Sequence, residues 1–238
     1  MQKKKVKAKV FRWNPELDAA PKYVEYEVPW RKYLTVLEIL RYIYENFDSI
    51  AFDYSCRSML CGKCGVQVNG KPVLACVTFV EPCDITIAPL KGLPVIRDLK
   101  VDRSMLELRS FRNKPELQRI KPVEEKLKPE ILPLNSVQKC MELFKCRSCY
   151  LCHAACPVVE FSKNKFCGPA LIVKIGLRVY DPRDEADRLM EAVNEGLWLC
   201  TLCSKCKEVC PREIDVPALI RDLRKKCMAK RVSLPAKK

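Results

Sequence analysis

The stretch CRSCYLCHAACP at residues 146–157 places four cysteines close together, and CTLCSKCKEVCP at residues 200–211 repeats the same spacing. Both stretches read C-x2-C-x2-C-x3-C-P, the bacterial 4Fe-4S run, in which three cysteines hold one cluster and the fourth reaches the other cluster. The sequence therefore predicts two 4Fe-4S centres with crossed ligands. One set is Cys146, Cys149, Cys152 and Cys210, and the other is Cys156, Cys200, Cys203 and Cys206.

A different spacing, C-x4-C-x2-C-x11-C, occurs earlier in the chain, at Cys56, Cys61, Cys64 and Cys76. This spacing is the plant-type 2Fe-2S pattern. Gly62 and Gly65 lie between and after the clustered cysteines, and we expect them to let backbone N–H groups approach the sulfurs. Zinc is the alternative metal, but zinc sites usually take their ligands as two separated pairs. The spacing therefore favours a 2Fe-2S centre.

The composition supports metal binding over disulfides. The chain has 238 residues, 48% of them hydrophobic, with sixteen cysteines and neither an export signal nor an apolar run long enough to span a membrane. We expect a cytoplasmic protein with enough apolar residues to form a hydrophobic core. Cys83, Cys140, Cys167 and Cys227 fit no ligand spacing and are expected to pack as small hydrophobic side chains. The single histidine, His153, lies inside a cluster loop as a candidate hydrogen-bond donor to a cluster.

The formal net charge of +15 raises the question of an acidic partner. Three clusters of about −2 each would leave about +9. A basic zinc module that binds nucleic acid is one alternative, from the basic residues 3–9 and 221–231, but zinc-finger spacing is lacking and no nucleic-acid partner is expected. The basic C-terminal residues are expected to be solvated, with anionic lipid or an acidic subunit as alternatives. These residues are Lys225, Lys226, Lys230, Lys237 and Lys238.

The first hundred residues alternate in the manner of strands. Apolar residues alternate over residues 5–11 and 23–28, and Thr35 is a plausible N-cap for an amphipathic helix that ends near Asn46. Two further short strands meet at Asn69-Gly70, a tight-turn dipeptide, and Ile85 and Ile87 suggest a last strand. This order predicts a β-grasp domain over residues 1–100.

Helical patterns dominate the remainder of the chain, at residues 136–144, 169–180, 183–194 and 217–226. The two four-cysteine runs lie at the junctions between these helices. The predicted class is therefore α+β, with a β-grasp 2Fe-2S ferredoxin domain followed by an all-α ferredoxin domain over residues 101–238. Signatures of substrate chemistry, such as a phosphate loop or a nucleophile with its base, are lacking. We therefore expect a chain that passes electrons and carries no catalytic residue.

One plant-type site followed by two four-cysteine runs resembles the iron-sulfur subunit of succinate dehydrogenase and fumarate reductase. The resemblance extends to YSCR and LAC around the first site, PVIRDLKVDRS at residues 94–104 and KFCGPA at residues 165–170. It implies the non-catalytic electron-transfer subunit of an oxidoreductase. It also implies a flavoprotein partner that carries FAD near the 2Fe-2S centre.

Three departures from the family pattern bear on the electron acceptor. Met59 stands where glycine is usual, and Cys203 fills a position that many members lack, which favours 4Fe-4S over 3Fe-4S at the third centre. Phe161 and Thr201 occupy the positions of the tryptophan and histidine of quinone-binding members. The chain thus resembles archaeal and thiol-driven fumarate reductases, whose partner has CCG domains similar to heterodisulfide reductase. Two alternatives stay open. One is a membrane-anchor partner, which would place the chain peripherally on the inner membrane face, and the other is an adaptor role between another flavoprotein and a heterodisulfide reductase-like or electron-bifurcating complex. The direction of electron flow also stays open.

Overall fold

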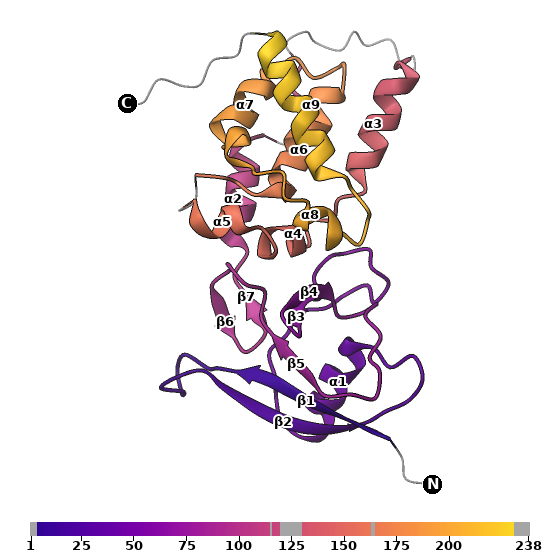
Figure 1. The fold of residues 1–238 in the computed structure, drawn as a ribbon, viewed down its shortest axis with the longest axis vertical. Helices are drawn as coiled ribbons and strands as arrows, with labels where there is room; N and C mark the ends of the chain where they lie inside the picture. The colour runs from indigo at the N-terminus through magenta and orange to yellow at the C-terminus, as the bar shows by residue number, and fades with distance from the viewer. Residues whose placement is uncertain (1–3, 115, 120–129, 163–164, 231–238) are drawn as a thin grey trace. The chain divides into compact units, whose positions relative to one another are not determined.

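The computed structural model describes residues 4–114, 116–119, 130–162 and 165–230 (Figure 1). The basic residues Lys3, Arg231, Lys237 and Lys238 lie outside these ranges. The chain forms two compact units, residues 1–103 with 147–155, and residues 104–146 with 156–238. Residues 147–155, from the first four-cysteine run, thus pack with the N-terminal part of the chain.

The first unit is built on a five-stranded sheet with the order β2-β1-β5-β3-β4. β1 pairs in parallel with β5, and the other pairs are antiparallel. Its helix α1 packs on the sheet (Figure 1). This arrangement confirms the predicted β-grasp architecture. The elements are β1 (Lys5–Arg12), β2 (Lys22–Pro29), α1 (Val36–Asn46), β3 (Gly65–Val68), β4 (Lys71–Leu74) and β5 (Ile85–Ala88).

The start of α1 follows from a capping box at Thr35. The Glu38 backbone N–H donates to Thr35 Oγ1 at 3.2 Å, and the Thr35 backbone N–H donates to Glu38 Oε2 at 2.9 Å. Two of the N–H groups that a helix start leaves unpaired are satisfied in this way. Val36, Leu40 and Ile43 are buried, as the apolar pattern predicts. At the β3–β4 turn, Asn69 and Gly70 both have positive φ, as the tight hairpin predicts.

A second, smaller sheet follows, formed by β6 (Val95–Arg97) and β7 (Lys100–Val101). Its turn carries Asp98, which is almost fully buried. Asp98 accepts hydrogen bonds from Arg12 Nε at 3.0 Å and from the backbone N–H groups of Trp13 and Ala51, at 3.0 and 2.9 Å. One carboxylate therefore ties β1 and the segment before the first cysteine loop to this hairpin.

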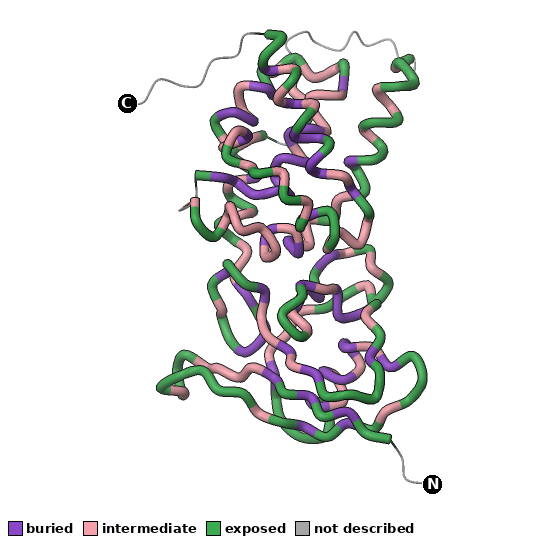
Figure 2. Tube along the Cα trace, viewed as in Figure 1, coloured by how far each residue is buried: buried purple, intermediate pink, exposed green. Residues whose placement is uncertain are grey.

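The second unit is helical in its described part, and its core lies along α6 (Figure 2). The predicted helix at residues 183–194 begins later, at Arg188, because Asp187 caps it through the Met190 N–H and Arg183 is bound to Asp181. The other predicted helices are present. The elements are α2 (Ser104–Arg112), α3 (Leu134–Phe144), α5 (Pro157–Phe161), α6 (Pro169–Tyr180), α7 (Arg188–Asn194), η1 (Leu197–Leu199), α8 (Lys205–Glu208) and α9 (Val216–Ala229), while α4 (Leu151–Ala154) belongs to the first unit. Over the described ranges, no helix has the length and apolar character needed to cross a membrane.

Candidate metal centres

The loop that begins at Cys56 wraps its backbone around a sulfur. The backbone N–H groups of Leu60 and Cys61 each lie 3.2 Å from Cys56 Sγ, and that of Ser58 lies 3.5 Å away. Hydrogen bonds from the backbone, led by Ser58, lower the pKa of the Cys56 thiol to about 6. The loop therefore holds Cys56 as a thiolate at neutral pH, which is the form that binds iron.

The left-handed backbone conformations in this loop explain how it can aim several N–H groups at one atom. Arg57 and Met59 have φ values of 58° and 60°. Alternation of left-handed and right-handed residues makes a concave backbone nest for an anion. The family's glycine at position 59 suits this conformation, whereas Met59 adopts it at a cost of about 1–2 kcal/mol. The substitution leaves the nest in place.

Cys64 and Cys76 approach the same site from the sheet, at the ends of β3 and β4. The Ala75 N–H donates to the Cys64 carbonyl at 2.9 Å, which holds the two segments together. Burial, together with the negative charges of Cys76 and Cys61, raises the pKa of the Cys64 thiol to about 12. Cys56 thus interacts with Cys61, and Cys64 interacts with Cys61 and Cys76, so the four thiols are neighbours of the soft kind that iron binds. Their role as one 2Fe-2S ligand set stays a prediction.

The two glycines of this loop pack closely against their neighbours, and the approach of N–H groups to the sulfurs that we expect from them stays a prediction. The hydrogen bonds to Cys56 come from Ser58, Leu60 and Cys61. Gly62 has φ +70° and lies against Arg147 and Cys149, and Gly65 lies against Leu90. Their role in the structure is close packing of the backbone.

The thiols of Cys156, Cys200, Cys203 and Cys206 gather within the second unit. Burial raises the pKa of Cys206 to about 12, and the charges of Cys200, Cys156 and Cys203 contribute to the rise. Burial also raises the pKa of Cys156, with contributions from Cys200 and Cys203. Cys203 alone among these four is exposed. Cys156 and Cys206 are therefore near enough to Cys200 and Cys203 to sense their charges, and the crossed ligand set stays a prediction.

Both four-cysteine runs contain a pair of left-handed residues two positions apart, as the first cysteine loop does. The residues on either side of the second cysteine are left-handed in each run, with φ between 48° and 65°. These residues are Ser148 and Tyr150 in one run, and Leu202 and Ser204 in the other. In the second run the Leu202 N–H lies 3.4 Å from Cys200 Sγ, so the nest again faces a sulfur.

The other predicted set is divided between the units. Cys149 and Cys152 belong to the first unit, and Cys146 and Cys210 belong to the second. This ligand set stays a prediction. His153 is buried, with its ring edge-on to Tyr150 at a centroid distance of 6.4 Å. Across the described residues, no three His, Cys, Asp or Glu side chains converge in the geometry of a single bound metal ion.

The four cysteines outside the predicted sets differ in environment. Cys167 and Cys227 are buried, and burial raises the pKa of each thiol, as expected of small hydrophobic side chains. Cys140 is half-buried, with its Sγ 3.6 Å from the Leu177 carbonyl oxygen. Cys83 is exposed, which differs from the packing expected for it.

Two arginines beside the cysteine loops escaped the sequence analysis. Arg103 donates to the carbonyls of Gly62 and Lys63, at 3.2 and 2.8 Å. Arg224 donates from α9 to the carbonyls of Leu197 and Cys200, at 2.9 and 2.6 Å. Each guanidinium also lies over an aromatic ring, Tyr150 at 5.9 Å for Arg103 and Trp198 at 5.4 Å for Arg224. The spacing of the cysteines does not predict which arginines bind the carbonyl groups of the cysteine loops.

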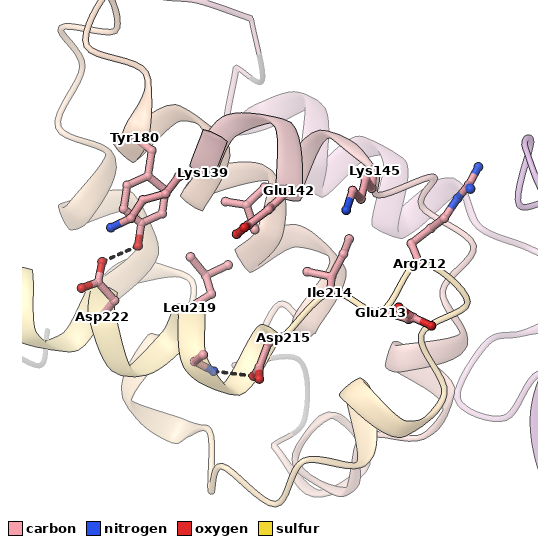
Figure 3. Close-up of a pocket in the computed structure, with 12 residues that line it drawn as sticks. Lys139, Glu142, Lys145, Tyr180, Arg212, Glu213, Ile214, Asp215, Leu219 and Asp222 are labelled. Carbon is pink, nitrogen blue, oxygen red and sulfur yellow. Dashed lines mark hydrogen bonds between the residues drawn. The ribbon is translucent and has the colours of Figure 1, made fainter. Parts of the chain in front are cut away.

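A cavity of about 490 Å³ opens in the second unit and contains none of the predicted ligands (Figure 3). Tyr180 donates a hydrogen bond to Asp222 on one wall, and burial and that bond raise the pKa of Tyr180. The charged residues of the lining carry both signs: Lys139, Lys145 and Arg212 against Glu142, Glu213, Asp215 and Asp222. Because the lining carries both signs of charge, the cavity favours neither an anionic nor a cationic ligand.

Comparison with known proteins agrees with these sites. Residues 7–107 match a 2Fe-2S iron-sulfur cluster binding domain, and residues 142–214 match a 4Fe-4S dicluster domain. The chain resembles a chain of the Mycobacterium smegmatis Sdh1 complex in the apo form, with a TM-score of 0.86 and 27% identity, covering 99% of this chain and 100% of that one.

The chain covers different shares of the length of two curated relatives. It is 38% identical to one subunit of the fumarate reductase (CoM/CoB) of Methanothermobacter marburgensis over 89% of this chain, but covers only 42% of that protein. It is 37% identical to the fumarate reductase iron-sulfur subunit of Mycobacterium tuberculosis, covering 89% of this chain and 88% of that protein. The chain therefore belongs to the family of iron-sulfur subunits of fumarate reductases and succinate dehydrogenases.

Proposed function

We propose that this chain is the electron-transfer subunit of a fumarate reductase or succinate dehydrogenase-like complex. It relays single electrons between a flavoprotein that carries FAD and a second redox partner. It holds one 2Fe-2S and two 4Fe-4S clusters, and it performs no chemistry on a substrate itself. When bound, the clusters supply one-electron storage, and the protein sets their spacing and potentials.

The observation that carries this proposal is the gathering of Cys156, Cys200, Cys203 and Cys206 in the second unit. A fourth thiolate retains the fourth iron of a cubane, and Cys203 supplies it. The backbone nest at Cys56 supports the 2Fe-2S centre in the same way, because it stabilises a thiolate before any metal arrives.

For the second partner, we propose a protein with CCG domains similar to heterodisulfide reductase. The methanogen relative whose name includes CoM/CoB is more than twice as long as the matched region, which leaves room for such a partner in one polypeptide. Phe161 is 77% exposed and Thr201 is exposed, at the positions where quinone-binding members have a tryptophan and a histidine. A membrane-anchor subunit is the competing partner, and it would hold the complex on the inner membrane face.

The proposal is tested by anaerobic purification followed by metal analysis and visible spectroscopy. About ten irons per chain are expected, from two, four and four. A colourless preparation loaded with zinc would contradict the proposal.

Purification of the native complex then separates the partners. A flavoprotein active on fumarate or succinate supports the assignment. A flavoprotein inactive on both would move the chain to the alternative role, an adaptor to a heterodisulfide reductase-like or electron-bifurcating complex.

A further inference from the structure

A partly buried arginine on α9, Arg224, binds the backbone at the start of the second four-cysteine run. Its Nη2 donates to the carbonyl oxygens of Leu197 and Cys200, at 2.9 and 2.6 Å, and its Nε donates to the Leu197 oxygen at 3.3 Å. Cys200 is the first cysteine of that run. One guanidinium therefore joins η1 to a predicted cluster ligand, through the planar fork that lysine lacks.

The segments on both sides of this contact are held firmly within the second unit. Leu223, the neighbour of Arg224 on α9, is fully buried, and so is Leu197 on η1. A Cβ atom built on Gly196 would lie 2.5 Å from the Lys165 carbonyl oxygen, so the backbone before η1 is packed too closely to shift. The position of Arg224 relative to Cys200 is thus set by two packed segments, as a precise site requires.

The charge of Arg224 is not neutralised by an acidic side chain. Among the described residues, no carboxylate lies within ion-pair distance of Arg224, and its hydrogen bonds go to carbonyl oxygens. Arg109 and Arg188, in the same unit, are instead paired with carboxylates. A cation removed from water is costly unless an anion lies near it. An oxidised 4Fe-4S centre on four thiolates, which carries about −2, would be such an anion.

We propose that Arg224 is a positioning residue of the third centre, predicted from Cys156, Cys200, Cys203 and Cys206, and that it raises the reduction potential of this centre. The inference rests on the proposed function, because it requires the cluster. Reduction adds one electron and takes the net charge of the cluster from about −2 to about −3, with no proton or atom transferred. A nearby positive charge stabilises the more negative state. The third centre is therefore a stronger electron acceptor with Arg224 than without it.

The expected size of this effect follows from the distance. Arg224 Nη2 lies 2.6 Å from the Cys200 carbonyl oxygen. The Sγ of a cysteine lies within about 5 Å of its own carbonyl oxygen, so this nitrogen is within about 8 Å of Cys200 Sγ. A unit charge about 10 Å from a cluster, at an effective dielectric constant of about 20, changes the ratio of oxidised to reduced centre about tenfold. For a one-electron couple, tenfold corresponds to about 59 mV.

The first test is a redox titration of the full, cluster-loaded chain, monitored by electron paramagnetic resonance. Arg224→Gln should keep about ten irons and shift the potential of one 4Fe-4S centre by about 59 mV to more negative values. Arg224→Lys keeps the charge and should stay near the wild-type potential. Arg221→Gln is the matched control, because Arg221 is an exposed arginine one turn earlier on α9. The 2Fe-2S centre, whose predicted ligands lie in the other unit, is the internal reference.

The second test measures the fork separately from the charge, as the release of iron to a chelator. Glutamine and lysine cannot bind the carbonyls of Leu197 and Cys200 in the geometry of a guanidinium. Arg224→Gln and Arg224→Lys should therefore both release iron several-fold faster than Arg221→Gln. The potential thus reports the charge of Arg224, and iron release reports its hold on Cys200.

The outcomes separate this inference from the proposed function. Equal potentials in Arg224→Gln and Arg221→Gln, at full iron content, would overturn the effect on the potential. Wild-type rates of iron release in Arg224→Lys would overturn the positioning of Cys200. If Arg224→Gln takes up no third cluster, uptake in Arg224→Lys at the wild-type potential supports the role of the charge, and failure there too would overturn it. A wild-type chain without clusters would instead overturn the proposed function.

Discussion

Replacement of Cys203 by alanine is expected to convert the third centre from 4Fe-4S to 3Fe-4S. Cys203 is the exposed member of its set, whereas Cys206 is buried and Cys156 and Cys200 are half-buried. Removal of the exposed thiolate therefore leaves three ligands inside the unit and opens one corner of the cluster towards solvent. The iron at that corner has lost its protein ligand and should be released.

The expected magnitude follows from the cluster formulas. The wild-type chain should contain about ten irons and about ten inorganic sulfides, because each cubane carries four of each and the 2Fe-2S centre carries two of each. A 3Fe-4S centre keeps four sulfides, so Cys203→Ala should contain about nine irons and still about ten sulfides. The ratio of iron to sulfide is thus more diagnostic than the iron content alone.

Iron and sulfide analysis of anaerobically purified variants, with electron paramagnetic resonance of the oxidised protein, makes the measurement. Oxidised 3Fe-4S is paramagnetic and oxidised 4Fe-4S is silent, so a new signal should accompany the loss of one iron. Cys83→Ala is the matched control, since Cys83 is also exposed and lies in no predicted ligand set. Retention of about ten irons in Cys203→Ala would refute the ligand role of Cys203. Loss of about four irons would refute the claim that the other three thiolates suffice.

Three further outcomes test the local chemistry of the first unit. Thr35→Ala should lower the free energy of unfolding by about 1 kcal/mol, seen as a lower urea midpoint, because it removes the capping box of α1. In the metal-free chain, Cys56 should react with iodoacetamide with a midpoint near its pKa of about 6 and lose reactivity below it, as its thiolate is protonated, while Cys64, with a pKa of about 12, stays unreactive at neutral pH. A similar pH midpoint for the two thiols would contradict the nest. Asp98→Ala should destabilise the chain by about 1–3 kcal/mol in the same urea assay, because it leaves the backbone N–H groups of Trp13 and Ala51 without their acceptor while Asp48 still pairs with Arg12; an unchanged urea midpoint would contradict the role of Asp98 in joining these segments.

The sequence predicts those parts of the fold that local rules govern. Alternation and the Asn69-Gly70 turn predict the hairpins, and Thr35 with its apolar face predicts α1, because both depend on residues near in sequence. The helix at Arg188 begins later than predicted because Asp187 competes as an N-cap. The packing of residues 147–155 with the first unit was not predictable, because it depends on the shapes of Gly62 and Gly65 and on contacts distant in sequence.

At the candidate site, too, the sequence predicts only part of the structure. Cysteine spacing predicts which thiols gather, but not how the backbone between them is folded. Arg57, Met59, Ser148, Tyr150, Leu202 and Ser204 all adopt left-handed conformations that glycine would adopt more easily. Nothing in these residue types predicts that conformation.

These left-handed residues explain why the loops need support from outside. Each costs about 1–2 kcal/mol relative to an ordinary conformation, and each cysteine loop contains two of them. Such strain persists only where the surroundings fix the backbone. Arg103 binds the carbonyls beside Cys61 and Cys64, and Arg224 binds the carbonyl of Cys200 at the start of the other nest. Both arginines therefore bind the backbone of loops that contain strained residues, and they help to hold these loops in the shape that presents N–H groups to a thiolate. It follows that the loops are prepared for clusters by residues outside the cysteine motifs.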